Sequence, residues 1–215
     1  MKKIIITGGI ASGKTEATRV FQTLGVPLID SDKIAHDLLV IHAPAYQETL
    51  EHFGTSILDA NQHINRSKLG EIIFSNPFEK AWLENLLHPL VLDKIKEKIK
   101  KLEQTSPPPV YCLIDIPLYA EIILSEKNKL KKEFASLSDQ ILVIDLDEAT
   151  QKKRLLSRYH EKNIKINPDK INAILAAQAT RADRNTLATH IIDNHLDLIQ
   201  LKNAVLKLHQ QYNRH

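Results

Sequence analysis

The feature of this sequence that most constrains its fold is a phosphate-binding loop motif near the N-terminus. Gly8–Thr15 reads GGIASGKT, which satisfies the pattern G-x-x-x-x-G-K-[ST]. The motif directly follows the apolar run Ile4–Ile6, which has the composition of a buried strand. The sequence therefore predicts a strand, a tight loop and a helix that together hold a polyphosphate.

The residue types in this loop are those that the chemistry needs. Glycine lets the backbone turn tightly enough for successive N–H groups to face a phosphate, and the following helix directs its positive dipole end to the same place. Lys14 is expected to neutralise charge between the β- and γ-phosphates of ATP, and the Thr15 hydroxyl is a candidate Mg²⁺ ligand. The alternative is a glycine-rich turn that only caps a helix. The predicted nucleotide contacts in this run are Gly9, Ile10, Ala11, Ser12, Gly13, Lys14, Thr15 and Glu16.

Short runs rich in branched aliphatic residues recur along the chain, and a longer helical pattern follows each of them. This alternation predicts βαβ units, and with the loop motif it predicts an α/β P-loop NTPase fold whose mostly parallel five-stranded sheet is flanked by helices. Ligands of such sheets bind beyond the carboxyl ends of the strands, so the site is expected at that edge. The predicted strands are Ile4–Ile6, Val26–Ile29, Val110–Ile116, Ile141–Leu146 and His190–Ile192.

The stretch between the second and third predicted strands has helical spacing and no convincing strand, which predicts an inserted helical lobe that binds a substrate. Pro44 and Pro77 stand where first helical turns can begin, and Asn65 precedes an amphipathic segment. Pro107–Pro109 stiffens the return to the sheet. We expect a nucleotide-binding core of residues 1–31 and 110–215, and a lobe of residues 32–109.

Composition and charge point to a globular protein without an obvious polyanionic partner. The 215 residues are 43% hydrophobic and 26% charged, and the formal net charge is +3. Two segments are rich in lysine, as nucleic-acid-binding segments often are: Asp93–Lys101 and Lys127–Lys132. In the first, Ile95 and Ile99 recur at helical spacing, so the lysines are better explained as the solvated face of a helix. We expect no nucleic-acid partner.

The sequence also favours a cytoplasmic protein. Cys112 is the single cysteine, so no disulfide can form within the chain. The apolar start breaks at Thr7–Gly9, which disfavours an export signal, and no apolar run approaches the roughly 20 residues that cross a bilayer. We therefore expect no membrane partner. A monomer and a small homo-oligomer both remain open.

A pair of carboxylates distinguishes among the classes of nucleotide-binding protein. Asp30 and Asp32 follow the second predicted strand, at the edge where a nucleotide lies. One carboxylate of such a pair can help to hold hydrated Mg²⁺, the role we assign to Asp30, while the other accepts a proton from an attacking hydroxyl. The alternative for Asp32 is a helix N-cap. A GTPase is disfavoured because the nearest match to its N-K-x-D motif, Asn128–Lys131, ends in lysine.

At this point the sequence resembles the dephospho-CoA kinase family of P-loop kinases over nearly its whole length. Beyond the P-loop, no single matching segment is specific for the family, but the set of segments in this order along the chain is specific. The pieces after the loop are Leu24–Val26, Ile29–His36, Ile64–Leu69, Ile73–Phe74, Leu86–Leu90, Ile116–Leu118, Glu121, Gln151–Leu155, Arg158, Ala176–Gln178, Arg181 and Ile191–Asn194.

The resemblance implies roles for residues outside the loop. It makes Asp32 the base that acts on the acceptor hydroxyl, and Arg66 and His88 substrate contacts from the lobe. An arginine suits a pyrophosphate because it forms bidentate charged hydrogen bonds. His88 precedes Pro89, which is expected to hold it away from ordinary helical geometry. Without the resemblance, a surface arginine explains Arg66 equally well, and a structural histidine is the commoner explanation for His88.

The resemblance also implies a helical lid around residues 150–181. Arg154 and Arg158 are spaced i, i+4, so both can project from one helical face over the phosphates. A basic helix surface is the alternative. Asn194 is expected among the nucleotide contacts, and Asp115 is a candidate Walker-B carboxylate that supports Mg²⁺ indirectly.

Three positions depart from the family's usual pattern. Ala11 replaces a common glycine, which is tolerable if its backbone torsions are ordinary. Thr189 replaces an aspartate, and His195 stands where glycine is usual. The segment Ser125–Ser138 is also long for the family.

The resulting hypothesis is ATP-dependent phosphorylation of the ribose 3′-hydroxyl of dephospho-CoA, giving CoA and ADP in the last step of coenzyme A synthesis. One alternative is another small-molecule P-loop kinase that acts on a nucleoside, nucleotide or sugar. A second alternative is a nucleotide-dependent regulatory or nucleic-acid-binding module.

Overall fold

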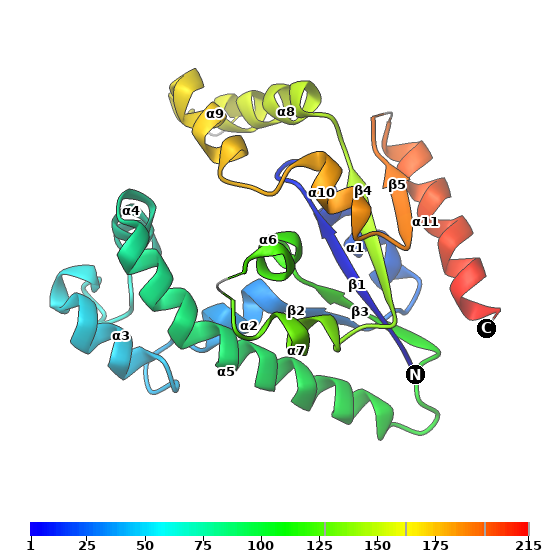
Figure 1. Ribbon diagram of the computed structural model, residues 1–215, viewed down its shortest axis with the longest axis horizontal. Coiled ribbons are helices and arrows are strands. Elements are labelled where there is room, and N and C mark those ends of the chain that lie inside the picture. The colour runs from blue at the N-terminus through cyan, green and yellow to red at the C-terminus, as the bar shows by residue number, and fades with distance from the viewer. Residues whose placement is uncertain (127, 162, 196, 215) are drawn as a thin grey trace. The chain divides into compact units, whose positions relative to one another are not determined.

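The computed structural model describes residues 1–126, 128–161, 163–195 and 197–214 (Figure 1). The chain divides into two compact units. The first consists of Met1–Ile29 together with Lys101–His215, and the second consists of Asp30–Lys100.

The described part of the chain forms one five-stranded sheet with the strand order β2-β3-β1-β4-β5. The central strand β1 pairs in parallel with β3 and β4, and β4 pairs in parallel with β5. The predicted α/β architecture is therefore confirmed. The strands are β1 (Lys2–Gly8), β2 (Leu28–Asp30), β3 (Tyr111–Asp115), β4 (Gln140–Asp145) and β5 (His190–Asp193).

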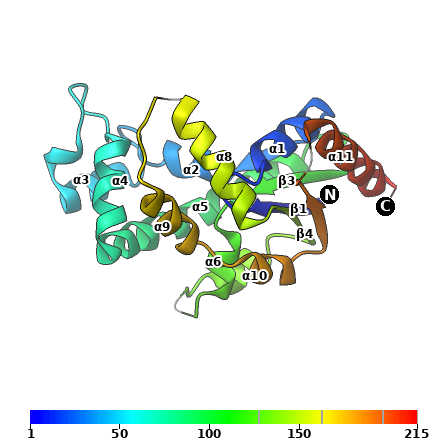
Figure 2. The ribbon, with the colours of Figure 1, turned by 90° about the horizontal axis from the view of Figure 1, so that it is seen from above.

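Helices cover both faces of this sheet. Figure 2 shows α1 and α11 on one side of the strands and α6 and α10 on the other. Helices α8 and α9 pack against each other. The helices of the first unit are α1 (Lys14–Thr23), α6 (Tyr119–Leu124), α7 (Lys131–Ala135), α8 (Glu148–Glu161), α9 (Pro168–Ala176), α10 (Arg181–Thr186) and α11 (Leu198–Asn213).

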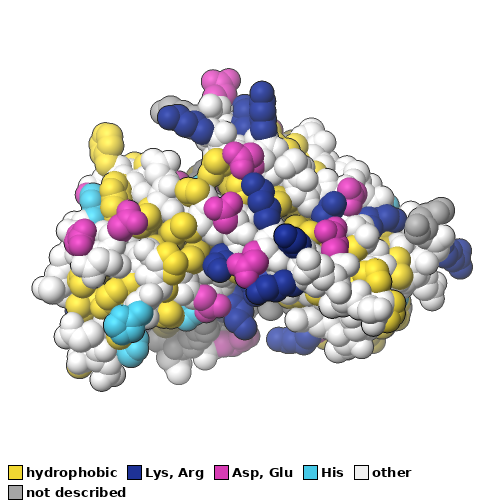
Figure 3. All heavy atoms as spheres, turned by 90° about the horizontal axis from the view of Figure 1, so that it is seen from below, with side chains coloured by type: hydrophobic (Ala, Val, Ile, Leu, Met, Phe, Trp, Pro, Cys, Tyr) yellow, Lys and Arg dark blue, Asp and Glu magenta, His cyan; other side chains and the backbone are white. Residues whose placement is uncertain are grey.

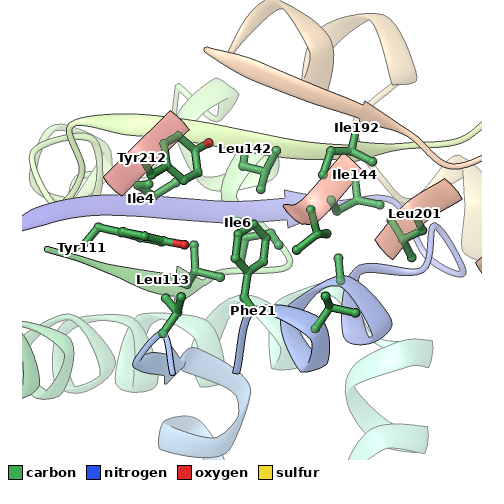
Figure 4. Close-up of a cluster of buried hydrophobic side chains, with 14 residues drawn as sticks. Ile4, Ile6, Phe21, Tyr111, Leu113, Leu142, Ile144, Ile192, Leu201 and Tyr212 are labelled. Atoms are coloured by element: carbon green, nitrogen blue, oxygen red, sulfur yellow. The ribbon is translucent and has the colours of Figure 1, made fainter. Parts of the chain in front are cut away.

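The main apolar core lies between the sheet and the helices α1 and α11 (Figure 4). Ile4 and Ile6 are two residues apart on β1, so both point to the same face of the sheet. Phe21 of α1 meets the Tyr111 ring edge-on, with 6.5 Å between the ring centroids. This packing fixes the axis of α1, and hence the place where its N-terminus follows the loop.

The second unit is helical, as the sequence predicts. Its helices are α2 (Ser31–Asp37), α3 (Tyr46–Phe53), α4 (Arg66–Ser75) and α5 (Pro77–Glu103), with a 3₁₀ turn at Thr55–Ile57. Helix α5 continues across the boundary into the first unit. An isolated antiparallel bridge joins Leu58 and Ile64. Asn65 caps α4, because its Oδ1 accepts hydrogen bonds from the N–H groups of Ser67 and Lys68.

Helix α5 corrects one prediction and confirms another. Pro89 lies inside this helix, so the expectation that Pro89 holds His88 out of helical geometry is wrong. A proline within a long helix can be accommodated because the neighbouring turns keep their hydrogen bonds. Ile95 and Ile99 are buried, so the first lysine-rich segment is the amphipathic helix that its spacing predicts. Lys127, where the second lysine-rich segment begins, lies outside the described residues.

The surface mixes charges of both signs. On the face drawn in Figure 3, Lys and Arg side chains are interspersed with Asp and Glu side chains. Within the described ranges, none of the helices combines the length and the apolarity that a membrane crossing requires.

Candidate active site

The phosphate-binding loop joins β1 to α1, as its sequence predicts. Gly13 is the N-cap of α1 and has a left-handed backbone with φ of 92°. A Cβ atom on Gly13 would also lie 2.2 Å from Nδ2 of Asn194. Both the torsion and the close approach require glycine at this position.

Ala11 has a left-handed backbone as well, with φ of 59°. Ordinary torsions, the condition under which alanine replaces glycine here without cost, are therefore not met. Loops that present successive N–H groups to an anion alternate right-handed and left-handed residues, and the tight turn imposes this torsion on whatever residue is present. The left-handed region costs an L-residue about 1–2 kcal/mol, so the loop stores strain at Ala11.

Side chains from distant segments hold the loop backbone from outside. Asn194, which follows β5, donates from Nδ2 to the carbonyl oxygen of Ser12 over 2.6 Å. Arg154 of α8 donates to the Asn194 carbonyl oxygen over 2.9 Å and more weakly to that of Ala11 over 3.5 Å. Asn194 is buried. The two predicted nucleotide contacts Arg154 and Asn194 therefore lie directly against the loop.

Ile10 is held from both sides. Its N–H group donates to Oε1 of Gln178 over 2.9 Å, and its carbonyl oxygen accepts from Nε2 of Gln151 over 2.8 Å. Ile10 and Ala11 also pack against an apolar cluster of α8 and α9 that contains Leu155 and Ile171. The predicted lid segment is thus attached to the loop by polar and by apolar contacts.

Lys14, the first residue of α1, forms an ion pair with Asp115 at the end of β3. Its Nζ lies 2.5 Å from Oδ1 and 2.7 Å from Oδ2 of Asp115. Both side chains are largely buried, at 14% and 9% exposed. Because the low dielectric around them strengthens the attraction, Asp115 fixes the ammonium group beside the loop.

The residues that follow Lys14 lie at the surface of α1. Thr15 is exposed, and Glu16 forms a 2.6 Å ion pair with Arg19 one turn along the helix. Thr15 and Asp115 supply hydroxyl and carboxylate oxygens, the donors that Mg²⁺ prefers. Among the described residues, no three His, Cys, Asp or Glu side chains come together to hold a metal ion. This donor set fits Mg²⁺, which keeps several waters and takes one or two protein ligands besides substrate phosphates.

The predicted lid arginines differ in their surroundings. Arg154 is half-buried and bound to the loop, whereas Arg158, one turn further along α8, is exposed. Because the two arginines are four residues apart within α8, they nevertheless lie along one side of the helix.

The remaining predicted residues belong to the second unit. Asp30 is the N-cap of α2, since its Oδ1 accepts the Lys33 N–H group over 2.9 Å. The alternative in which Asp32 is the N-cap is therefore wrong. Asp32 lies in the first turn of α2, and its side chain is exposed.

Arg66 and His88 lie on different helices of the same unit. Arg66 begins α4 and is exposed, while His88 lies in the middle of α5 and is half-buried. Burial lowers the pKa of His88, against the opposing effect of Glu84. The His88 imidazole is consequently neutral near neutral pH.

Comparison with known proteins agrees with this geometry. The sequence model of dephospho-CoA kinase matches residues 3–200 of the chain. The chain belongs to the dephospho-CoA kinase family. It is 40% identical to the dephospho-CoA kinase of Colwellia psychrerythraea over 215 residues, which cover 99% of this chain and 96% of the relative. It is 37% identical to that of Coxiella burnetii over 212 residues, covering 99% and 97%.

A solved structure of the same family supports the fold. The dephospho-CoA kinase from Campylobacter jejuni superposes with a TM-score of 0.67 at 26% identity, covering 98% of this chain and 97% of the other. The P-loop kinase fold predicted from the sequence is therefore confirmed.

Sequence reasoning missed an arginine–aspartate pair in this member of the dephospho-CoA kinase family. Nε of Arg181 donates to both carboxylate oxygens of Asp145 over 2.9 Å, and one terminal nitrogen donates over 2.5 Å. Asp145 is buried at the end of β4, and it raises the pKa of Arg181. A signal was present, because Asp145 closes an apolar strand just as Asp115 does.

Sequence reasoning also gave no role to the polar side chains that pack on Gly9. A Cβ atom there would lie 2.2 Å from Nε2 of Gln151 and 2.8 Å from the guanidinium of Arg184. Both side chains are buried. Their partners are backbone groups of the loop and of Ala179, which no residue pattern announces.

Proposed function

We propose that this chain transfers the γ-phosphoryl group of ATP to the ribose 3′-hydroxyl of dephospho-CoA, giving CoA and ADP. Membership of the dephospho-CoA kinase family is the observation that carries the activity, and it assigns the chain to the final step of coenzyme A synthesis. The loop geometry supports the ATP side of the reaction, because Lys14 stands at a glycine-rich turn that opens a helix.

On the nucleotide side, Gly9–Thr15 would receive the polyphosphate of ATP, with Glu16 beside it. Lys14 would exchange part of its contact with Asp115 for the β- and γ-phosphates, since an ammonium group has three donors and can serve both partners. Arg154 and Arg158 would add positive charge from α8, and Asn194 would hold the loop. Mg²⁺, when bound with ATP, would neutralise charge on the phosphates. We assign Thr15 and Asp30 as its candidate oxygen ligands, with Asp115 supporting it indirectly.

On the acceptor side, Asp32 would take the proton from the attacking hydroxyl. Its position in the first turn of α2, with the side chain exposed, leaves the carboxylate accessible to an acceptor hydroxyl. Arg66 would bind the pyrophosphate of dephospho-CoA through bidentate hydrogen bonds. His88, whose pKa is lowered, would contact the substrate as a neutral hydrogen-bonding group rather than as a cation. We propose residues 32–109 as the substrate lobe and residues 150–181 as the lid that excludes water during transfer.

The test is ADP release from ATP and Mg²⁺ with and without dephospho-CoA, with mass spectrometry of the acceptor. A gain of one phosphoryl group on dephospho-CoA, lost in Lys14→Ala, is the expected result. ADP release that does not depend on dephospho-CoA, together with an unmodified acceptor, would contradict the proposal. A screen of nucleosides, nucleotides and sugars would then identify the acceptor.

A further inference from the structure

Two glutamines far apart in the sequence bind the same loop residue. Gln178 is 168 residues from Ile10 and accepts its N–H group, while Gln151 is 141 residues away and donates to its carbonyl oxygen. The polarity of the backbone fixes the orientation of both amides, since an N–H group can only donate and a carbonyl can only accept. Gln151 is only 4% exposed, so water does not substitute for its hydrogen bond at low cost.

These glutamines stand at the two ends of the predicted lid. Gln151 lies in the first turn of α8, and Gln178 follows directly after the C-cap of α9. Both ends of the segment are therefore fastened to one residue of the phosphate-binding loop. The apolar contact of Ile10 with the α8–α9 cluster reinforces the attachment.

Gly9 is adapted to the same arrangement. A side chain on Gly9 would place its Cβ 2.2 Å from Nε2 of Gln151, which is far inside van der Waals contact. Gly9 is not among the glycines with a positive φ, which are Gly13, Gly25 and Gly54. Close packing, and not backbone conformation, therefore explains why glycine stands at this position. The loop sequence thus makes room for the amide that holds its neighbour.

We propose that Gln151 and Gln178 are positioning residues that couple the conformation of the phosphate-binding loop to closure of the lid through the backbone of Ile10. The inference rests on the proposed function, because it concerns phosphoryl transfer from ATP. A loop shaped by bound phosphates holds Ile10 in one place, and Ile10 then holds both lid ends. Without the two amides, ATP still binds to the loop, but the lid closes less often and water reaches the γ-phosphate.

The test replaces both glutamines by glutamate, because Gln151 supplies an amide nitrogen that donates to Ile10 whereas Gln178 supplies an amide oxygen that accepts from it. Gln151→Glu removes the amide donor that binds the Ile10 carbonyl and sets an oxygen against it. Gln178→Glu retains an acceptor for the Ile10 N–H group, whereas Gln178→Leu removes it. Gln178 is half-buried, so its variants are expected to fold even if Gln151→Glu does not. Ser157→Ala, on the exposed side of α8, is the matched control.

We expect Gln151→Glu and Gln178→Leu to lower kcat by about tenfold and to change the KM for ATP by less than about threefold. Both should also increase the ADP formed per CoA produced, a ratio that a loss of folded protein would not change. Gln178→Glu should recover most of the kcat lost in Gln178→Leu. Equal values for these two variants, or an unchanged ADP-to-CoA ratio, would overturn the inference.

Amide hydrogen exchange separates this inference from the proposed function, because it needs ATP but no acceptor. ATP and Mg²⁺ should slow exchange in residues 150–181 of the wild type and of Ser157→Ala, but much less in Gln178→Leu. Equal protection in Gln178→Leu would overturn the coupling even if the wild type is an active kinase. A wild type that shows coupled protection but does not phosphorylate dephospho-CoA would instead overturn the proposed function alone.

Discussion

In the first unit, the residues of the candidate site are held by partners distant in sequence. Lys14 pairs with Asp115, 101 residues away, and the Ser12 carbonyl is bound by Asn194, 182 residues away. In the second unit, the caps at the starts of the helices that carry Asp32 and Arg66 are local, from Asp30 to Lys33 and from Asn65 to Ser67 and Lys68. The nucleotide side is thus a product of tertiary packing, whereas local helix starts present Asp32 and Arg66. Substitutions of the candidate residues should therefore affect stability together with activity in the first unit, and mainly activity at the exposed Asp32 and Arg66 of the second.

The strongest test of this comparison is Lys14→Ala. We expect turnover to fall by about 10³-fold, because a charge aimed at the transferring phosphoryl group is lost. Stability should also fall by on the order of 3 kcal/mol, because Asp115 is left buried without this cation. Steady-state kinetics and urea unfolding measure the two effects.

The double variant Lys14→Ala/Asp115→Asn is the control for Lys14→Ala. It should regain part of the stability and none of the activity, since the buried charge is then removed as well. A double variant no more stable than Lys14→Ala would show that the pair does not link site and fold.

Asp32→Asn tests the other half of the comparison. We expect turnover to fall by at least about 10²-fold as the proposed base is lost, with ATP affinity unchanged and the unfolding midpoint changed far less than in Lys14→Ala. The reason for the small change in stability is that the Asp32 side chain is exposed. Asp30→Asn, which keeps an N-cap side chain, is the matched control for helix stability. Near-wild-type turnover in Asp32→Asn would remove its role as base.

Two glycine-to-alanine substitutions, one in each unit, compare the packing of the two units through the free energy of unfolding. Gly9→Ala should destabilise the first unit by about 1–3 kcal/mol, because its Cβ would overlap Gln151. Gly70→Ala, in the interior of α4, should stabilise by about 0.5–1 kcal/mol, because alanine favours helix and no described atom beyond the neighbouring residues and the helix backbone lies within 4 Å of its Cβ. Denaturant midpoints at constant m-value measure both. Equal effects would contradict the different packing of the two units.

The smallest expected effects are opposite pH dependences of two histidines. Burial lowers the pKa of His88 in the folded chain, so as the pH falls the unfolded chain takes up the imidazole proton before the folded chain does. The free energy of unfolding therefore decreases as the pH drops below about 6.5, the ordinary pKa of histidine. The hydrogen bond to Asp193 raises the pKa of His195, with Asp147 adding to the effect. That contribution is complete below about 6.5 and is lost as the pH rises through the raised value.

Unfolding midpoints between about pH 5 and pH 8.5 measure these two slopes. His88→Asn should flatten the acid side, and His195→Asn should flatten the alkaline side by a smaller amount because His195 is near the surface. A variant that changes the other side of the profile would contradict the assignment. Acceptor kinetics of His88→Asn test its separate role as a substrate contact.

Much of the fold and part of the site could be predicted from local patterns. The strand–loop–helix of Gly8–Thr15, the five strands and the helical second unit all follow from periodicity and turn chemistry. The helical geometry of His88 was predicted wrongly, because the length of α5 overrides the preference of the residue before a proline. The left-handed torsion of Ala11 follows from packing of the whole loop, which the sequence left open. The roles of Asp32, Arg66 and Arg158 remain predictions.

The sequence by itself determined the position of the candidate phosphate-binding loop, because the residue types that surround a phosphate are adjacent in the chain and their effect is local. Only the tertiary structure decided what holds that loop in shape. The partners of Lys14, Ile10 and Ser12 are single polar side chains more than 100 residues away, brought to one sheet edge by parallel strand pairing. One buried hydrogen bond between distant residues leaves no periodic trace in a sequence, since it depends on two positions and not on a pattern.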